Sequence, residues 1–458
     1  MRTLLVAAGT TPNIMYEKER AGSFQLDAKK KFFQPHSVVP GAGTPGAGEV
    51  GPFQLVSDPN GFFTSYSSGQ RFVTYYGDNH PRYAGNVVKA MASARDGFPQ
   101  VTKLFARELA SLDPSKQTER DRAWAALVAT LDADLLAHVE DLVRLTPTIV
   151  EVIVKAPAAA RHFRPGQFYR LQNYESVARR VDGTPLLMEG IALTGAWVDK
   201  ERGLLSLIVL ELGASSRLVP YLEKGEPVVV MGPTGSPTEI PEHQNVLLLG
   251  GGLGNAVLFS IAKALRDNGN KVLYFAGYKK GEDLFKREDI ESATDQVIWS
   301  TDIGAEIQPG RPQDSHFRGN IVQAMLAYQK GDFGTCVVPL ESVDRVIAIG
   351  SDRMMAAVKA ARHGVLAPYL KQEHVGIASI NSPLQCMMKE VCAQCLQKHV
   401  DPATGRESII FSCFNQDQEM DRVDFPNLAA RLRQNTVQEK LSSLWFDHLV
   451  RGQSLDHV

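Results

Sequence analysis

The spacing of hydrophobic residues changes along the chain, and each spacing predicts a different kind of structure. Between residues 143 and 241, short apolar runs alternate with polar positions and are separated by Gly and Pro, as in Thr148–Lys155 and Leu204–Leu210. Alternation with a period of two is typical of strands that have one buried face. Several such strands at short spacing predict a small antiparallel barrel.

From residue 244 to about residue 380, apolar strands alternate with amphipathic helices. Val246–Leu249 and Lys271–Ala276 are short apolar runs. The segment between them, Asn255–Asp267, carries its apolar side chains at helical spacing and is followed by Gly269, which favours a left-handed helix end. This alternation predicts a doubly wound parallel sheet, so the predicted fold class is α/β combined with a β-barrel.

Helical spacing also marks residues 100–142, which precede the predicted barrel. The apolar residues at this spacing include Trp124, Leu127, Leu131, Leu135 and Leu142, and charged residues fall between them. The pattern predicts a helical segment that packs against and links the neighbouring domains.

The first 99 residues contain few predicted elements. A buried-strand pattern at Leu4–Ala8 ends in a turn signal, and Pro35–Pro52 is a loop rich in Gly and Pro. Further along, Arg71–Tyr76 has the pattern of a strand and Asn86–Arg95 that of a helix. These elements are too few for a free-standing domain, so we expect this segment to be the end of a larger module.

Composition narrows the class of protein. The chain has 458 residues, 44% of them hydrophobic, which is ordinary for a globular protein of several domains. Its 49 Lys and Arg residues nearly balance 51 Asp and Glu residues, and the net charge of -2 argues against a nucleic-acid partner. The most apolar long run, Val246–Leu265, is interrupted by glycines and contains Lys263, so it does not predict a membrane span. The first residues lack the long apolar core of a signal peptide, and we therefore expect a cytoplasmic protein with no membrane insertion.

Four of the five cysteines lie in one short window near the C-terminus. Three are close together and the fourth is more distant: Cys386, Cys392, Cys395 and Cys413. Thiolates are soft, anionic ligands that suit iron, and plant-type [2Fe–2S] sites use such a triplet with a distant fourth thiolate. A structural zinc ion more often uses two separated pairs, and it stays the alternative at this point. The fifth cysteine, Cys336, stands alone and is interpreted as a buried structural residue.

A glycine-rich turn between a predicted strand and a predicted helix is the second candidate site. Its glycines are Gly250, Gly251, Gly252 and Gly254. Glycines allow the backbone to approach a pyrophosphate closely, and the helix N-terminus supplies oriented N–H groups, so the turn predicts a nucleotide site. No acidic residue directly follows the second strand to hold a ribose hydroxyl. Tyr278-Lys279-Lys280 stands there instead, which leaves NADH and NADPH open.

Two further motifs would each be interpreted as a turn if they stood alone. They are Arg164-Pro165-Gly166-Gln167-Phe168 before a strand and Gly213-Ala214-Ser215-Ser216-Arg217 later in the barrel region. Their order with the glycine turn, with Gly350-Ser351-Asp352-Arg353-Met354 and with the cysteines resembles that of the ferredoxin–NADP reductase superfamily. Within it, residues 143–425 are similar to the electron-transfer subunits of dihydroorotate dehydrogenase and to the small subunit of NADH-dependent ferredoxin:NADP oxidoreductases.

The resemblance implies an FAD-binding barrel, a nicotinamide-binding domain and a C-terminal [2Fe–2S] cluster. It implies that the FAD site includes Arg164, Pro165, Gly166, Gln167 and Phe168, and that the FAD pyrophosphate contacts Gly213, Ser215 and Ser216. It also implies a nicotinamide pocket lined by Gly250, Gly251, Gly252, Gly254, Gly350 and Met354. Hydride transfer to a flavin demands no side-chain acid or base, so no catalytic residue is predicted.

The chain departs from the superfamily pattern in three places. The flavin-facing strand of the family carries an Arg-Pro-x-Ser motif, whereas the matching stretch Met188–Thr194 lacks the basic residue. Ser351 stands where the family has a proline, and the first gap between the cysteines is one residue longer. The altered strand is the best support for an alternative function, a non-catalytic assembly subunit with a degenerate flavin site.

The N-terminal segment carries motifs of a different kind, VAAGTTPN and YYGDNHPRYAGNVVKAMASAR. These resemble the closing part of flavoproteins with two Rossmann domains, such as the small subunit of glutamate synthase. The resemblance implies that Gly77 and Asp78 bind ribityl and phosphate groups of an FAD. It also implies that another chain or an upstream module supplies the other half of that site.

Together these patterns predict five regions. They are a partial flavoprotein module over residues 1–99, a helical linker over 100–142, an FAD-binding barrel over 143–241, an NAD(P)-binding domain over 242–380, and a [2Fe–2S] segment with a helical tail over 381–458. The predicted function is electron transfer between NAD(P)H, FAD and the cluster, with a redox partner subunit, an upstream flavoprotein module or ferredoxin as the partner. The reductase component of an oxygenase is the second enzyme alternative.

Overall fold

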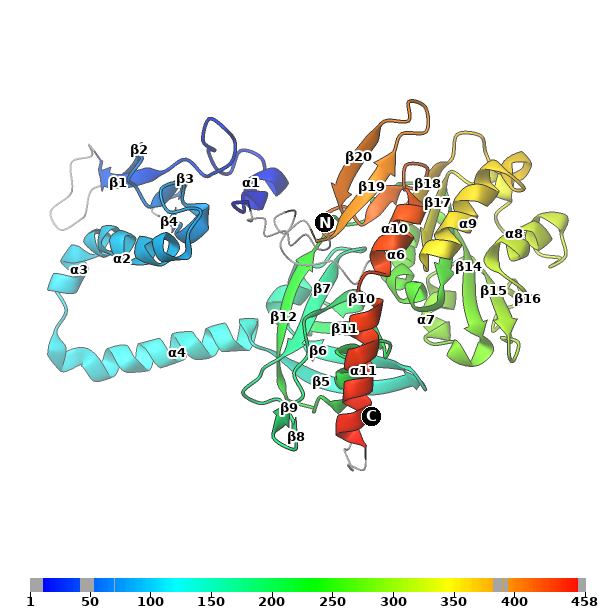
Figure 1. The fold of residues 1–458 in the computed structure, drawn as a ribbon, viewed down its shortest axis with the longest axis horizontal. Coiled ribbons are helices and arrows are strands. Elements are labelled where there is room, and N and C mark those ends of the chain that lie inside the picture. The colour runs from blue at the N-terminus through cyan, green and yellow to red at the C-terminus, as the bar shows by residue number, and fades with distance from the viewer. Residues whose placement is uncertain (1–10, 42–52, 70, 382–389, 391–393, 452–458) are drawn as a thin grey trace, which may run out of the picture. The chain divides into compact units, whose positions relative to one another are not determined.

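The computed structural model describes residues 11–41, 53–69, 71–381, 390 and 394–451. The chain divides into two compact units, Met1–Ala125 with Met388–Ala393, and Ala126–Met387 with Gln394–Val458. Each unit is described by itself below and is labelled in Figure 1.

The first unit contains a four-stranded antiparallel sheet. Its strands, in the order β2-β1-β3-β4, are β1 (His36–Pro40), β2 (Phe53–Ser57), β3 (Phe63–Ser68) and β4 (Arg71–Thr74). Aromatic side chains form its core, and Phe62, Tyr75 and Tyr83 surround the buried ring of His80. The predicted strand near Arg71 and the helix that follows are confirmed. The helices of this unit are α1 (Met15–Glu19), α2 (Val87–Leu104) and α3 (Ala106–Ala110).

Two expectations for this unit need correction. The Pro35–Pro52 stretch is not wholly a loop, because its first residues form β1 and pair with β2. The unit therefore has enough elements to build a sheet with a core, contrary to the expectation from the sequence. The predicted strand Leu4–Ala8 lies outside the described residues.

The linking helix α4 runs over Gln117–Leu135, as the spacing predicts, but two details differ. Its apolar residues Trp124, Leu127, Leu131 and Leu135 are exposed, and the packing role expected of them stays a prediction. The helical segment also ends earlier than predicted, because Ala137–Thr146 forms strand β5 and pairs with β6. The buried positions Ala137 and Val139 alternate with less buried ones, which is a strand pattern that the helical spacing of the leucines obscured.

The predicted barrel is confirmed as a closed antiparallel barrel of six strands in the order β10-β11-β6-β5-β12-β7. Closure follows because β10 pairs with both β7 and β11. Inward-facing aliphatic side chains such as Val152, Leu171 and Leu207 fill its core. The six strands are β5 (Ala137–Thr146), β6 (Ile149–Lys155), β7 (Phe168–Asn173), β10 (Ile191–Asp199), β11 (Leu204–Leu210) and β12 (Pro227–Thr234). Around them lie the hairpin β8 (Arg180–Val181) and β9 (Thr184–Pro185), helix α5 (Pro157–Arg161) and the short helix η3 (Ser216–Tyr221).

The predicted doubly wound sheet is confirmed as a seven-stranded sheet in the order β16-β15-β14-β13-β17-β18-β21. Neighbouring strands are parallel except at the edge, where β21 pairs with β18 in the antiparallel direction. Leu247 and Leu249 face one apolar cluster while Val246 and Leu248 face another, so the central strand is buried on both sides. The strands are β13 (Asn245–Gly251), β14 (Lys271–Lys280), β15 (Gln296–Ile303), β16 (Ser315–Arg318), β17 (Arg345–Ile349), β18 (Val375–Ser379) and β21 (Asp417–Glu419).

The strand order reverses between β13 and β17, and ligands of such sheets bind where it does. The covering helices are α6 (Asn255–Asp267), α7 (Arg287–Ser292), α8 (Ile321–Lys330) and α9 (Asp352–His363). The remaining short helices of the chain are η1 (Gly77–Asn79), η2 (Pro114–Lys116), η4 (Gly252–Gly254), η5 (Gly281–Asp283), η6 (Leu340–Ser342) and η7 (Ala367–Tyr369).

The C-terminal region consists of a hairpin and two helices. These are β19 (Leu396–Val400), β20 (Glu407–Phe411), α10 (Phe425–Leu432) and α11 (Thr436–Val450). None of the helices in the described part of the chain combines the length and the apolar character that a membrane crossing needs.

Candidate functional site

The glycine turn lies at the carboxyl end of β13, as predicted, and its glycines have different roles. A methyl group added at Gly254 would lie 2.5 Å from the backbone oxygen of Ile349, and one at Gly250 would lie 2.0 Å from Oδ1 of Asn255. These two glycines are therefore required for packing. Gly252 differs, because it has φ +56° and open space around it.

Hydrogen bonds from two buried side chains fix the shape of this turn. Asn255 Nδ2 donates to the carbonyl oxygens of Gly252 at 2.9 Å and Gly277 at 3.3 Å. The Tyr274 hydroxyl donates to Asn255 Oδ1 at 2.5 Å, and burial raises the pKa of Tyr274, so the phenol stays protonated. Neither residue was predicted from the sequence, although a polar residue at the first position of an apolar helix was a signal for Asn255.

A cavity of about 1030 Å³ opens beside the turn, at the reversal point of the strand order. Of the predicted nicotinamide residues, Gly251, Gly252 and Met354 line it directly. Gly250 and Gly254 are not among its lining residues, and Gly350 packs against Met354 from behind. The polar side chains of its wall are Lys279, Ser300, Asp302, Asn320, Gln323, Ser351 and Arg353.

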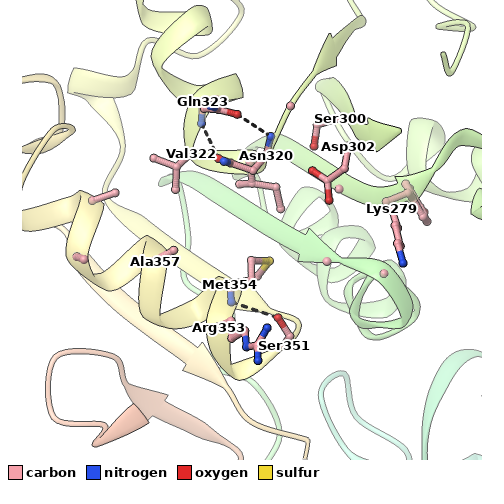
Figure 2. Close-up of a pocket in the computed structure, with 18 of the residues that line it drawn as sticks. Lys279, Ser300, Asp302, Asn320, Val322, Gln323, Ser351, Arg353, Met354 and Ala357 are labelled. Atoms are coloured by element: carbon pink, nitrogen blue, oxygen red, sulfur yellow. Dashed lines mark hydrogen bonds between the residues drawn. The ribbon is translucent and has the colours of Figure 1, made fainter. Parts of the chain in front are cut away.

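The ends of two helices contribute to the wall. Ser351 Oγ accepts a hydrogen bond from Met354 N–H at 3.2 Å, which caps α9 and directs Met354 into the cavity. At α8, Asn320 and Gln323 cap each other's backbone N–H groups at 3.0 and 3.1 Å. Figure 2 shows Asp302 and Lys279, from neighbouring strands, on one side of the cavity, with Met354 and Arg353 on another.

The charged side chains in the wall of this cavity differ from those expected from the sequence. Of the residues Tyr278, Lys279 and Lys280, Tyr278 is buried and Lys280 faces solvent, so only Lys279 brings a positive charge to the wall. No acidic residue directly follows the second strand, but one lies near the end of the third, β15, as Asp302. It escaped notice because strand order in space cannot be read from sequence spacing alone.

The serine loop of the barrel, residues 211–217, is held by its own hydroxyls. Ser216 Oγ accepts hydrogen bonds from the N–H groups of Leu212 at 3.1 Å and Gly213 at 3.0 Å. Ser215 Oγ accepts from the N–H of Glu189 at 3.1 Å. The structure therefore brings this loop next to the altered stretch Met188–Thr194, which the resemblance places in the same flavin site.

An arginine from the neighbouring strand reaches that altered stretch. Arg170, on β7, lies opposite Ala192 of β10, and its Nη2 donates to the carbonyl oxygen of Gly190. A methyl group added at Gly190 would lie 2.9 Å from Arg170 Nε, so glycine is needed to seat the guanidinium. A positive charge is thus present beside this strand although the strand's own basic residue is missing. No sequence motif marked Arg170, because its contact arises from strand pairing.

Residues Arg164–Phe168, the RPGQF motif, form a tightly packed turn. Gly166 has φ +87°, and Gln167 accepts from Arg164 N–H at 3.0 Å and donates to the Gly235 carbonyl at 2.9 Å. Phe168 is fully buried, whereas Arg164 is exposed and Pro165 is half-buried. In this structure Gly166, Gln167 and Phe168 stabilise the barrel end, and their predicted FAD contact stays a prediction.

Two of the four predicted cluster cysteines are described, and they lie together. Cys395 immediately precedes β19 and Cys413 follows β20, so the hairpin brings them side by side, and Cys413 N–H donates to Cys395 Sγ at 3.3 Å. Both are buried. Cys386 and Cys392 lie outside the described residues, and among those described no group of three metal-binding side chains occurs. Cys336 is exposed, so its interpretation as a buried residue is wrong.

The hairpin end is connected to the barrel by Gln416. Its Nε2 donates to the carbonyl oxygens of Gly166 at 2.8 Å and Ser236 at 2.7 Å. Ser236 N–H in turn donates to the Phe414 carbonyl at 3.0 Å. Cys413 therefore lies three residues before the side chain that contacts Gly166 in the turn Arg164–Phe168 of the barrel.

In the first unit, Gly77 and Asp78 occupy a turn before α2. Gly77 has φ +67°, and its N–H donates to Ser93 Oγ at 2.8 Å. Asp78 Oδ1 accepts from Gly85 N–H at 3.2 Å. The order of strand, Gly-Asp turn and helix is as expected, while the FAD contact of this pair stays a prediction.

Comparisons with known proteins agree with the second unit's architecture. No family model matches the chain. It is 32% identical over 371 residues to the uncharacterized protein RP006 of Rickettsia prowazekii, a match that covers 81% of this chain and 41% of that protein. It is 27% identical over 305 residues to a dihydroorotate dehydrogenase B (NAD(+)) electron transfer subunit homolog of Thermotoga maritima, covering 66% of this chain and 92% of that one.

Among solved structures, the chain is similar to an NADH-dependent reduced ferredoxin-NADP oxidoreductase described in connection with flavin-based electron bifurcation. The TM-score is 0.54 at 25% identity, over 68% of this chain and 98% of that one. The closed barrel and the doubly wound sheet with a cavity at its reversal point define the chain as one with the ferredoxin–NADP reductase fold. The predicted resemblance to that superfamily, and within it to the dihydroorotate dehydrogenase electron-transfer subunits, is confirmed.

Proposed function

We propose that the chain is an electron-transfer flavoprotein that carries electrons between a nicotinamide nucleotide, an FAD on the barrel and a [2Fe–2S] cluster. The observation that carries the proposal is the cavity of about 1030 Å³ at the reversal point of the sheet, lined by Gly251, Gly252 and Met354. A cavity of this size can hold one nucleotide of a dinucleotide. It lies at the reversal point of the strand order, where nucleotides bind in sheets of this kind.

The chain's own residues bind and orient the nucleotide. Gly252 has open space around it, so a pyrophosphate can approach the backbone of the turn. We infer that NADH is preferred over NADPH, because the Asp302 carboxylate in the wall repels a 2′-phosphate and accepts hydrogen bonds from a 2′-hydroxyl. Lys279 lies in the same wall and its positive charge would favour a 2′-phosphate, so variants of Asp302 and Lys279 decide which charge controls the preference.

On the barrel, the flavin would be held by the serine loop and by Arg170. Ser215 contacts Glu189 and the Arg170 guanidinium contacts Gly190, two adjacent residues just before β10, so hydrogen-bonding groups and a positive charge suited to a diphosphate lie close together. FAD, when bound, accepts a hydride and releases electrons one at a time. No acid or base is assigned, and the protein's contribution is position, charge and exclusion of water.

The cluster is proposed on the four cysteines, with zinc as the alternative. The support is the buried pair Cys395 and Cys413 at the open end of one hairpin, where two anionic ligands can share a centre. The sequence spacing of Cys386 and Cys392 supplies the other two ligands. Electrons would pass from this end of the chain to a redox partner subunit or to ferredoxin.

The experiment that tests the proposal uses the full chain, purified without oxygen. We expect flavin absorbance near one FAD per chain and, after reduction, a rhombic low-temperature EPR signal from a [2Fe–2S] cluster. Cys413→Ala should abolish the EPR signal, and Cys336→Ala is the matched control because that thiol is exposed and distant in sequence. Stoichiometric zinc without iron would refute the cluster, and a colourless protein would favour the assembly-subunit alternative.

The N-terminal unit is proposed as a partial flavin module that another protein or module completes. Because β5 begins at Ala137, a cut at Leu142 would remove a barrel strand, and Leu136 is the correct place to divide the chain. We expect the fragment from Ala137 onward to retain the flavin and the fragment that ends at Leu136 to be colourless. Tight FAD binding by the N-terminal fragment alone would refute the partial module.

A further inference from the structure

The C-terminal helix α11 packs directly on the serine loop of the barrel. Phe446 is only 5% exposed, belongs to the barrel core, and contacts Tyr221 edge-on with ring centroids 5.8 Å apart. Leu449 and Val450 pack beside it. The helix is therefore anchored to the barrel by its last two turns (Figure 1).

Two carboxylates of this helix face the loop. A methyl group added at Gly213 would lie 2.6 Å from Oε2 of Glu439, so this carboxylate oxygen touches the loop where glycine leaves room. Asp447 Oδ1 accepts from Arg217 Nη2 at 2.5 Å. The Arg217 guanidinium also lies 4.8 Å from the centre of the Phe446 ring and donates to the Ser443 carbonyl at 3.3 Å.

One of these contacts is at Gly213, which the flavin diphosphate is expected to contact, and the other is at Arg217, which directly follows Ser216 in the same loop. An arginine that forms a close pair with a carboxylate cannot present the same edge to a phosphate, and carboxylate and phosphate compete for one geometry. Glu439 adds a negative charge next to Gly213, so a dianionic diphosphate would meet repulsion at this loop. The acidic residues of α11 are these two, and both belong to the face that contacts the barrel.

We propose that α11 is a built-in competitor for the flavin site: Glu439 and Asp447 take the place of the FAD diphosphate on residues 211–217, and FAD binding displaces them. The inference rests on the proposed flavin site and adds its regulation. The helix needs no further ligand to act, because its anchor Phe446 keeps it near the loop at high effective concentration. Factors that hold α11 away from the barrel therefore favour the flavin-bound form.

The test compares FAD affinity of the flavin-stripped full chain with that of the Glu439→Gln/Asp447→Asn double variant. We expect the double variant to bind FAD roughly tenfold more tightly, because two competing charges are removed while the helix itself is kept. Asp132→Asn is the matched control, since it removes an exposed carboxylate from α4 and should leave FAD affinity unchanged. Limited trypsin digestion supplies a second readout: FAD should speed cleavage after Lys440 in the wild-type chain.

The outcomes separate this proposal from the flavin site itself. Equal affinities for wild type and double variant, or weaker binding by the double variant, would overturn the competition while leaving the flavin site intact. Protection of Lys440 by FAD would also overturn it, because the helix would then close on the flavin instead of yielding to it. Failure of both proteins to bind FAD would refute the proposed flavin site, and the competition with it.

Discussion

The two candidate cofactor sites of the second unit are both glycine-containing turns, but they differ in how much of each turn is accessible to a ligand. At the nucleotide turn, Gly252 faces open space and a cavity of about 1030 Å³. At the serine loop, Gly213 faces the Glu439 carboxylate, and Arg217 is paired with Asp447. The first turn therefore opens on a cavity, whereas the second is contacted by the chain's own C-terminal helix.

The difference shows that a glycine-containing turn in the sequence predicts where a phosphate could contact the backbone. It does not predict whether another segment of the chain already occupies that position. Access depends on which distant segment packs over the turn. At the nucleotide site, the nearby side chain is Met354, which is flexible and apolar and lines the cavity. At the flavin loop it is an acidic helix from more than two hundred residues away in the sequence.

The largest effect is expected at the open site. Gly252→Val should raise the KM for NADH roughly 100-fold, because a side chain at φ +56° strains the backbone and keeps it from the pyrophosphate. The flavin and iron content should stay near normal. Gly225→Val is the matched control, since Gly225 also has positive φ and open surroundings but lies far from the cavity wall. An unchanged KM in the Gly252 variant would place the nucleotide elsewhere.

At the covered site, Arg170 is the residue whose loss should matter most. Arg170→Gln should weaken FAD binding about tenfold, because a hydrogen bond to a charged group contributes about 1.5–3 kcal/mol. The affinity is measured by fluorescence titration of the flavin-stripped chain. Arg180→Gln, on the exposed β8 hairpin, is the control and should bind FAD as the wild type does. Equal binding by both variants would remove Arg170 from the flavin site.

The choice of nucleotide should respond to Asp302. Asp302→Ser is expected to shift the ratio of kcat/KM for NADPH over NADH upward by roughly tenfold, because the charge that opposes a 2′-phosphate is removed. Lys279→Gln should shift the ratio little or in the opposite direction. If Lys279→Gln instead impairs NADPH use strongly while Asp302→Ser has no effect, the preference for NADH is wrong.

The smallest effect concerns Asp417, which lies between the barrel and the edge of the sheet. Burial raises the pKa of Asp417, an effect partly offset by the hydroxyls of Ser379 and Thr238 and by Arg345. Because the pKa in the folded state lies above the ordinary value of 3.8, the protonated carboxyl stabilises the fold at low pH, and the free energy of unfolding falls as pH rises through the raised pKa. Asp417→Asn should flatten this dependence, measured as the free energy of unfolding in urea titrations at a series of pH values above the ordinary value of 3.8. An unchanged pH dependence would show that Asp417 is not the group responsible.

Much of the fold could be predicted because local patterns determine it. The alternation in Thr148–Lys155 and the helical spacing in Asn255–Asp267 both predicted the observed elements. The N-terminal sheet was missed since β1 lies within a Gly- and Pro-rich stretch that reads as a loop. The start of the barrel was missed because leucines at helical spacing continued into β5.

The candidate sites could be predicted less completely than the fold. Local motifs with a defined backbone geometry were enough to predict three residues of the cavity wall, Gly251, Gly252 and Met354. Two residues were not predicted. The position of Asp302 in the cavity wall depends on the order of the strands in the sheet, and the contact of Arg170 depends on the pairing of β7 with β10. No local sequence pattern predicts that Glu439 lies against Gly213, because this contact depends on where the C-terminal helix packs.

We propose that electrons enter from NADH at the glycine turn and reach a flavin on the barrel. Anaerobic titration of the full chain with NADH, followed by flavin absorbance at about 450 nm, measures this transfer directly. We expect the absorbance to be bleached in the wild type, and Gly252→Val to require a far higher NADH concentration for the same bleaching. A bound flavin that dithionite reduces and NADH does not would show that electrons do not take this route.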